Sequence, residues 1–167
     1  MEETTQHTRE SAEQEIVITR LIDAPLQYVY RAWTTQSIMA RWWGPKDFTN
    51  PVCELDVKPS GEIRIDMRAP DGTVYPMGGI FHEIIEPDKL VFTTTAFKDA
   101  DGKWKLEVLN TVNFDEKEGK TEVTISLRII ERSPETESSV AGMETGWNQS
   151  LDRLEEVLKD KAAFENL

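Results

Sequence analysis

The sequence predicts a single α+β domain in which a curved antiparallel sheet of six to seven strands grips a long C-terminal helix. Three observations lead to this prediction. Residues 62–130 repeat a two-residue alternation of apolar and polar side chains, interrupted by turn-forming dipeptides. Two short helical patterns precede this region, and one long helical pattern follows it. Because an antiparallel sheet must cover its apolar face, the long helix is expected to lie across it.

The first part of the chain is a polar segment followed by a segment in which apolar and polar residues alternate. Residues 1–14 are polar and acidic, which predicts a disordered tail. A first strand is expected from Glu15 onward, where Ile16, Ile18 and Ile22 supply the apolar positions. We therefore place the start of the ordered domain at residue 15.

Two short helices are expected after the first strand. Asp23 is a candidate N-cap, with Pro25 in the first turn, where a missing N–H group has no cost. Val29 and Trp33 then fall four residues apart on one helix face. The second helix is marked by Ile38, Met39 and Trp42, and it ends at Gly44-Pro45.

The middle of the chain predicts consecutive hairpins. Asp71-Gly72, Asp101-Gly102 and Glu118-Gly119 are turn signals between the alternating segments. Because no helix intervenes between these segments, the sheet is expected to be antiparallel. The expected strands cover residues 62–68, 77–85, 89–97, 104–114 and 121–130.

The last part of the chain returns to a helical pattern after Ser133-Pro134-Glu135. Apolar residues from Trp147 to Leu158 recur at spacings of four, three and four, which places them on one helix face. Gly142 and Gly146 suggest a kink or a close approach to the sheet, since glycine costs ~1 kcal/mol inside a helix. The domain is expected to span residues 15–162, with a C-terminal tail at 163–167.

Composition excludes several functions. The 167 residues include 31 acidic and 19 basic side chains, a net charge of −12, which argues against nucleic-acid binding. No apolar run approaches a membrane span, and the N-terminus lacks the order of a secretory signal. The single cysteine, Cys53, excludes an intramolecular disulfide framework. We expect a cytoplasmic protein that is a monomer or a homodimer.

Several motifs along the chain carry a resemblance to a known family. They are Ile22-Asp23-Ala24-Pro25, Arg41-Trp42-Trp43-Gly44-Pro45, Asp71-Gly72, residues 79–84, Leu90-Val91-Phe92-Thr93 and Gly146-Trp147. With these motifs the chain resembles the START-like, or SRPBCC, superfamily, which shares the helix-grip fold of the birch pollen allergen. Within it, the chain is most similar to the activator of heat-shock protein 90 ATPase homologue family.

The resemblance implies three possible functions. Most members of the superfamily hold a small hydrophobic or amphipathic molecule between the sheet and the C-terminal helix, without catalysis. The family name implies, as an alternative, an interaction with a chaperone. A minority of superfamily members are cyclases or dehydratases, which use polar side chains that project into the pocket.

A ligand cavity is therefore expected between the sheet and the C-terminal helix. Large aromatic rings, two methionines and a leucine supply its apolar lining. Asn110 falls in an apolar row of its strand. Because a buried amide must find hydrogen-bond partners, its side chain is expected to hydrogen-bond either the backbone or a ligand. The candidate ligand-binding residues are Trp33, Trp43, Met67, Phe81, Phe92, Asn110, Met143, Trp147 and Leu151.

Other chemistry has less support. Arg64, Asp66 and Arg68 alternate with apolar residues, so they face either water or, for an enzyme, the pocket. Cys53 and His82 form the one potential Cys–His pair, but no orienting third group is evident, and Cys53 is better explained as a buried apolar residue. The two histidines have no partners at ligand spacing, so neither a metal nor a cofactor is expected.

Overall fold

The computed structural model describes residues 15–165, so the tail expected at residues 1–14 lies outside the described residues. The strands are β1 (Glu15–Ile22), β2 (Thr49–Leu55), β3 (Glu62–Arg68), β4 (Val74–Ile85), β5 (Lys89–Lys98), β6 (Trp104–Lys117) and β7 (Lys120–Glu131). The helices are α2 (Leu26–Thr34), α3 (Gln36–Trp42), η1 (Pro134–Thr136), α4 (Glu137–Ala141), α5 (Met143–Val157) and α6 (Ala162–Glu165).

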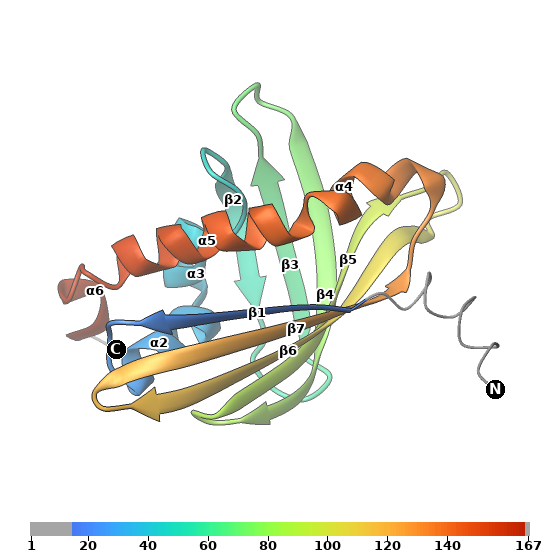
Figure 1. Ribbon diagram of the computed structural model, residues 1–167. Coiled ribbons are helices and arrows are strands. Elements are labelled where there is room, and N and C mark those ends of the chain that lie inside the picture. The colour runs from blue at the N-terminus through green and yellow to red at the C-terminus, as the bar shows by residue number, and fades with distance from the viewer. Residues whose placement is uncertain (1–14, 166–167) are drawn as a thin grey trace, which may run out of the picture.

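The seven strands form one antiparallel sheet in the order β1-β7-β6-β5-β4-β3-β2. The first strand therefore pairs with the last, and β1 and β2 form the two edges. Figure 1 shows the sheet curving around α4 and α5, which run across it. The α+β helix-grip architecture predicted from the sequence is confirmed.

Alternation places the apolar side chains of the sheet on the face toward the helices. In β7, Val123, Ile125 and Leu127 are fully buried, while the residues between them are partly exposed. Val112 and Phe114 continue the buried row in β6. These side chains and the apolar face of α5 belong to one continuous core, so the core occupies the concave side of the sheet.

Of the two short helices, α3 packs against α5, and α2 packs against α3 and the strands β6 and β7 (Figure 1). In α2, Val29 and Trp33 are fully buried, as their spacing predicted. The cap was predicted incorrectly: Pro25 occupies the N-cap position, and α2 has no side-chain cap from Asp23. The Pro25 carbonyl accepts bonds from the N–H groups of Tyr28 and Val29, so the helix starts without a capping side chain.

The C-terminal helical region is divided rather than continuous. Gly142 separates α4 from α5 with φ −92° and ψ 4°, which is the break that the glycine suggested. The tail expected from residue 163 is also corrected, because α6 extends to Glu165. Phe164 is buried there and stacks on Tyr28 with a centroid distance of 5.1 Å. The ring of Phe164 therefore holds α6 against α2.

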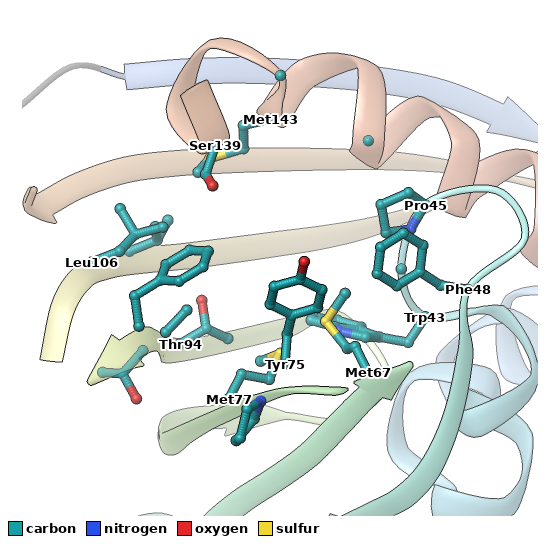
Figure 2. A pocket seen from close by; sticks show the side chains of 18 of the residues that line it. Trp43, Pro45, Phe48, Met67, Tyr75, Met77, Thr94, Leu106, Ser139 and Met143 are labelled. Atoms are coloured by element: carbon teal, nitrogen blue, oxygen red, sulfur yellow. The ribbon is translucent and has the colours of Figure 1, made fainter. Parts of the chain in front are cut away.

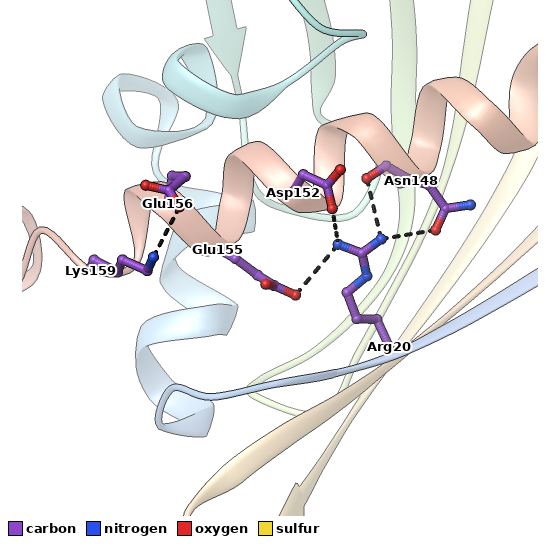
Figure 3. A network of polar contacts seen from close by, with 6 residues as sticks. All are labelled: Arg20, Asn148, Asp152, Glu155, Glu156 and Lys159. Carbon is purple, nitrogen blue, oxygen red and sulfur yellow. Dashed lines mark hydrogen bonds and ion pairs between the residues drawn. The ribbon is translucent and has the colours of Figure 1, made fainter.

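A polar cluster ties the outer side of α5 to the edge strand β1 (Figure 3). Arg20 Nη1 lies 2.6 Å from Asp152 Oδ1 and 3.5 Å from Glu155 Oε2. Its Nη2 donates to Asn148 Oδ1 at 3.0 Å. Because Asp152 is largely exposed, these contacts are screened by water and orient the helix more than they stabilise it.

Candidate functional site: a cavity between sheet and helix

A cavity of about 930 Å³ lies between the concave face of the sheet and the first half of the C-terminal helices (Figure 2). Residues of β3, β4, β5 and β6 line one side. Residues of α4 and α5 line the opposite side, and the loop after α3 closes one end. This volume is within the range of pockets that hold small molecules.

The loop that closes one end of the cavity is held by α5. Arg153 Nη1 donates to the carbonyl oxygen of Trp43 at 3.1 Å. The same nitrogen lies 3.0 Å from the carbonyl oxygens of Gly44 and Pro45. Ser150 Oγ also donates to the Gly44 carbonyl, at 2.8 Å. Burial lowers the pKa of Arg153, but a guanidinium stays protonated in proteins, so these bonds remain charge-assisted.

Gly44 is required at the turn of this loop. Its φ of +99° lies in a region that side chains rarely adopt. A Cβ atom there would also lie 3.2 Å from Met67 Cε, inside ordinary contact distance. The glycine of the Trp-Trp-Gly-Pro motif therefore lets the loop turn directly against the sheet.

Trp147 forms the aromatic wall on the helix side. Its ring stacks on Trp33 with a centroid distance of 5.6 Å and an interplanar angle of 10°. It meets Trp43 edge to face at 5.3 Å. Trp33 is fully buried behind it, so Trp147 is held by the core on one side and borders the cavity on the other. Met143 lies one turn earlier on the same wall.

A row of rings from β4, β5 and the loop before β2 leads toward the cavity mouth. Tyr75 pairs across the strands with Met67. Its ring lies 6.4 Å from Phe48 and 6.4 Å from Phe97. Figure 2 shows Tyr75 and Phe48 projecting toward the open volume. Tyr75 and Phe97 remain 41% and 37% exposed, so the cavity opens to solvent beside these rings.

Asn110 lies on the sheet side and is 1% exposed. Its Nδ2 donates to the Phe92 carbonyl at 3.0 Å and to the Val108 carbonyl at 3.2 Å. The sequence left open whether the Asn110 amide hydrogen-bonds the backbone or a ligand, and the structure shows hydrogen bonds to the backbone. Because Asn110 also lines the cavity, these backbone bonds do not exclude contact with a ligand.

The structure separates the predicted site residues into three groups. Phe81 and Phe92 pair with each other and border a small separate void of about 10 Å³. Trp33 and Leu151 are fully buried in the core and line neither volume. The predicted residues that line the large cavity are Trp43, Met67, Asn110, Met143 and Trp147.

Several lining residues were missed in the sequence analysis. Leu106 and Val108 share the strand face of Asn110, so alternation alone would have identified them. Tyr75 and Phe48 gave no such signal, because they lie beside a predicted hairpin turn and after a Gly-Pro pair. Nothing in their local pattern distinguishes a cavity mouth from a surface loop.

Charged groups lie away from the interior of the cavity. Arg64 and Arg68 are exposed, and Arg64 forms an ion pair of 3.5 Å with Asp66 on the outer face of β3. Within the described residues, the charged side chains that line the cavity are Lys98 and Glu135, both exposed. Arg64, Asp66 and Arg68 therefore do not line the cavity, whereas acid–base catalysis in it would need polar groups that point inward.

Cys53 has the environment of an unreactive thiol. Burial, together with the neighbouring Glu54 carboxylate, raises its pKa to about 11. His82 donates to or accepts from Thr93 Oγ1 instead, at 3.2 Å. No group of three or more His, Cys, Asp or Glu side chains within residues 15–165 is placed to hold a metal ion. Over the same residues, no helix combines the length and apolarity needed to cross a membrane.

The curved sheet, the gripped helix and the cavity between them define the class of the molecule: a START-like, or SRPBCC, domain. Within this class, the chain belongs to the family described as activator of Hsp90 ATPase homolog 1-like protein. The family model matches residues 23–159, which include the two short helices, all strands after β1, and the helices α4 and α5. No curated protein sequence matches the chain significantly.

Solved bacterial structures share this fold. A protein from Nitrosomonas europaea has a TM-score of 0.74 at 22% identity, covering 89% of this chain and 96% of its own. A protein from Arthrobacter aurescens has a TM-score of 0.75 at 24% identity, covering 87% and 86%. A third, from Staphylococcus epidermidis, has a TM-score of 0.73 at 25% identity, covering 89% and 92%. At this level of identity the likeness supports the fold alone.

Proposed function

We propose that this protein binds a small hydrophobic or amphipathic molecule, without catalysis, in the cavity between the sheet and α5. The observation that supports the proposal is the open volume of about 930 Å³, which is lined by rings and methionines rather than filled by them. An apolar volume that opens to water is stabilised when an apolar molecule displaces that water.

The aromatic walls suit a flat or flexible apolar guest. Trp43 and Trp147 are arranged edge to face at one end of the cavity, and Phe97 and Tyr75 are similarly arranged at the mouth. Met67 and Met143 can change rotamer to follow the shape of a guest. The charged residues at the rim are exposed, so recognition depends mainly on apolar contacts.

Native mass spectrometry of the purified protein tests this proposal. A reproducible excess mass that disappears on denaturation would support a bound molecule and identify its class. A protein without excess mass, and without saturable binding of an apolar fluorescent probe, would contradict the proposal.

Replacement of Trp147 tests the position of the site. Trp147→Ala removes a ring that borders the cavity and is expected to weaken binding of an apolar probe about tenfold or more, since a large ring contributes ~1.5–3 kcal/mol. Tyr28→Leu is the matched control, because Tyr28 stacks on Phe164 and does not line the cavity. Equal affinity in wild type and Trp147→Ala would remove Trp147 from the site.

The family description favours a second candidate function, an interaction with a chaperone. The net charge of −12 would suit a basic surface on such a partner. A chaperone pull-down combined with a measurement of chaperone ATPase activity tests this candidate. Stimulation that survives Trp147→Ala would show that the interaction does not depend on the cavity.

A further inference from the structure

Polar side chains interrupt the apolar lining of the cavity in several places, and two of them contact each other. Asn110 of β6 and Thr94 of β5 both line it. Asn110 Nδ2 lies 3.2 Å from Thr94 Oγ1, so the two side chains touch each other. We call Asn110 and Thr94 the polar pair. The following inference rests on the proposed function and specifies the chemistry of the guest.

The orientation of the Asn110 amide follows from its partners. Two of the contacts of Nδ2 are backbone carbonyls, those of Phe92 and Val108, which can only accept hydrogen bonds. The nitrogen must therefore point toward them, and the oxygen must point away. Oδ1 accepts no hydrogen bond from the described residues. Oδ1 is not fully enclosed by neighbouring atoms, and the side chain lines the cavity, where the residue as a whole presents a small surface, 1% of its area.

The Thr94 hydroxyl supplies the complementary group. Asn110 Nδ2 can only donate, and its two hydrogens are shared among three acceptors, one of which is Thr94 Oγ1. The hydroxyl hydrogen of Thr94 is therefore left for another acceptor. No acceptor for that hydrogen is present among residues 15–165. Figure 2 shows Thr94 on the sheet side of the cavity, facing Ser139 and Met143 across it. One free acceptor and one free donor therefore adjoin each other within the lining.

We propose that the polar pair binds an uncharged hydroxyl group carried by an aromatic guest. A hydroxyl both donates, here to Asn110 Oδ1, and accepts, here from Thr94 Oγ1, so one group satisfies both side chains. Because the charged residues of the lining are exposed, an ionised guest group at this depth would have no enclosed counter-charge. The rings of Trp43, Trp147 and Tyr75 then surround the body of the guest.

A pair of probes of equal shape tests the inference. We choose 2-naphthol and 2-methylnaphthalene, which differ by a hydroxyl in place of a methyl group, and measure both by equilibrium dialysis at pH 7. The measured quantity is the ratio of the two affinities. In Thr94→Val, which keeps the shape of the side chain and removes the donor, this ratio is expected to fall about fivefold relative to wild type.

Two further variants complete the test. Asn110→Leu removes the acceptor and should lower the same ratio by about fivefold or more. It also removes donors to two backbone carbonyls, so Thr94→Val keeps the test decisive if Asn110→Leu does not fold. Thr111→Val is the control, because Thr111 follows Asn110 on the opposite face of β6 and does not line the cavity.

The outcomes separate the inference from the proposed function. If both probes bind and the affinity ratio is the same in wild type and Thr94→Val, the hydroxyl site is wrong while the proposed function stands. If neither probe binds to wild type, both are wrong. A fall in the ratio that is seen in Thr94→Val and absent from Thr111→Val supports the polar pair.

Discussion

The two halves of α5 rest on different surroundings. Toward its C-terminal end, Leu151, Leu154 and Val157 are buried in the continuous core, and α5 packs against α3. Toward its N-terminal end, Met143 and Trp147 border the open cavity and remain partly exposed. One helix therefore anchors the fold at one end and forms the wall of a binding site at the other. Substitutions along it should separate stability from binding.

The largest effect on stability is expected in the anchoring half. Leu154 is fully buried, so Leu154→Ala should lower the free energy of unfolding by about 2–5 kcal/mol through lost contacts and a new void. Chemical denaturation measures this loss. Affinity for an apolar probe, measured on the folded fraction, should stay within about twofold of wild type because Leu154 does not line the cavity. A parallel loss of affinity would contradict the division of the helix.

Arg153 connects the two halves, and its replacement should have the next largest effect. In Arg153→Met the carbonyl groups of residues 43–45 lose a charged donor, which should lower the free energy of unfolding by about 2 kcal/mol. Hydrogen exchange should also increase in the loop from residue 43 to residue 48.

The control for Arg153 is Arg20 of β1, whose side chain contacts the outer side of the same helix (Figure 3). Its ion-pair partner Asp152 is largely exposed, so Arg20→Met should lower the free energy of unfolding by less than about 1 kcal/mol. Equal losses for the two variants would indicate that the loop contacts of Arg153 add nothing to stability.

Local patterns in the sequence predict nearly all of the fold. A period of two identified the strands from Glu62 to Glu131, because one face of the sheet is packed against apolar side chains. Spacings of three and four identified the buried face of α5, and Gly142 marked its beginning. Phe164 escaped the pattern, because a single aromatic residue in a four-residue helix has no periodicity.

The same patterns predict the candidate site less completely. Alternation identifies Phe81, Phe92 and Asn110 as inward-facing, but it does not say what lies opposite each of them. Phe81 and Phe92 face each other across neighbouring strands and close a small void, whereas Asn110 borders the large cavity. The difference depends on sheet curvature and on the position of the helix break, which are properties of the folded chain.

Two weakly acidic groups, the buried phenol of Tyr30 and the partly buried thiol of Cys53, predict a loss of stability at high pH. Burial, aided by Glu86, raises the pKa of Tyr30 to about 12, against 10.0 for an ordinary tyrosine. Burial and Glu54 raise the pKa of Cys53 from 9.0 to about 11. The unfolded chain therefore releases these protons first, so stability is complete below the ordinary pKa values and falls as pH rises toward the folded ones.

Denaturation midpoints measured from pH 8 to pH 12 test this expectation. Wild type should lose stability between pH 9 and pH 12. Cys53→Ala should flatten the decline between pH 9 and pH 11, and Tyr30→Phe should flatten it between pH 10 and pH 12. An unchanged slope in Tyr30→Phe would mean that the phenol ionises alike in the folded and unfolded chains.

The smallest effect on stability is expected in the half of α5 that borders the cavity. Met143 is partly exposed and its side chain adjoins open volume, so Met143→Ala creates no new closed void. The free energy of unfolding should fall by less than about 1 kcal/mol. Binding of an apolar probe should nevertheless weaken severalfold, because the lost methylene groups and sulfur face the guest.

Met143→Ala should therefore lose more affinity than stability, whereas Leu154→Ala should lose more stability than affinity. A variant that lost as much stability as Leu154→Ala would show that this end of the helix is packed as tightly as the other, and that no open cavity lies beneath it.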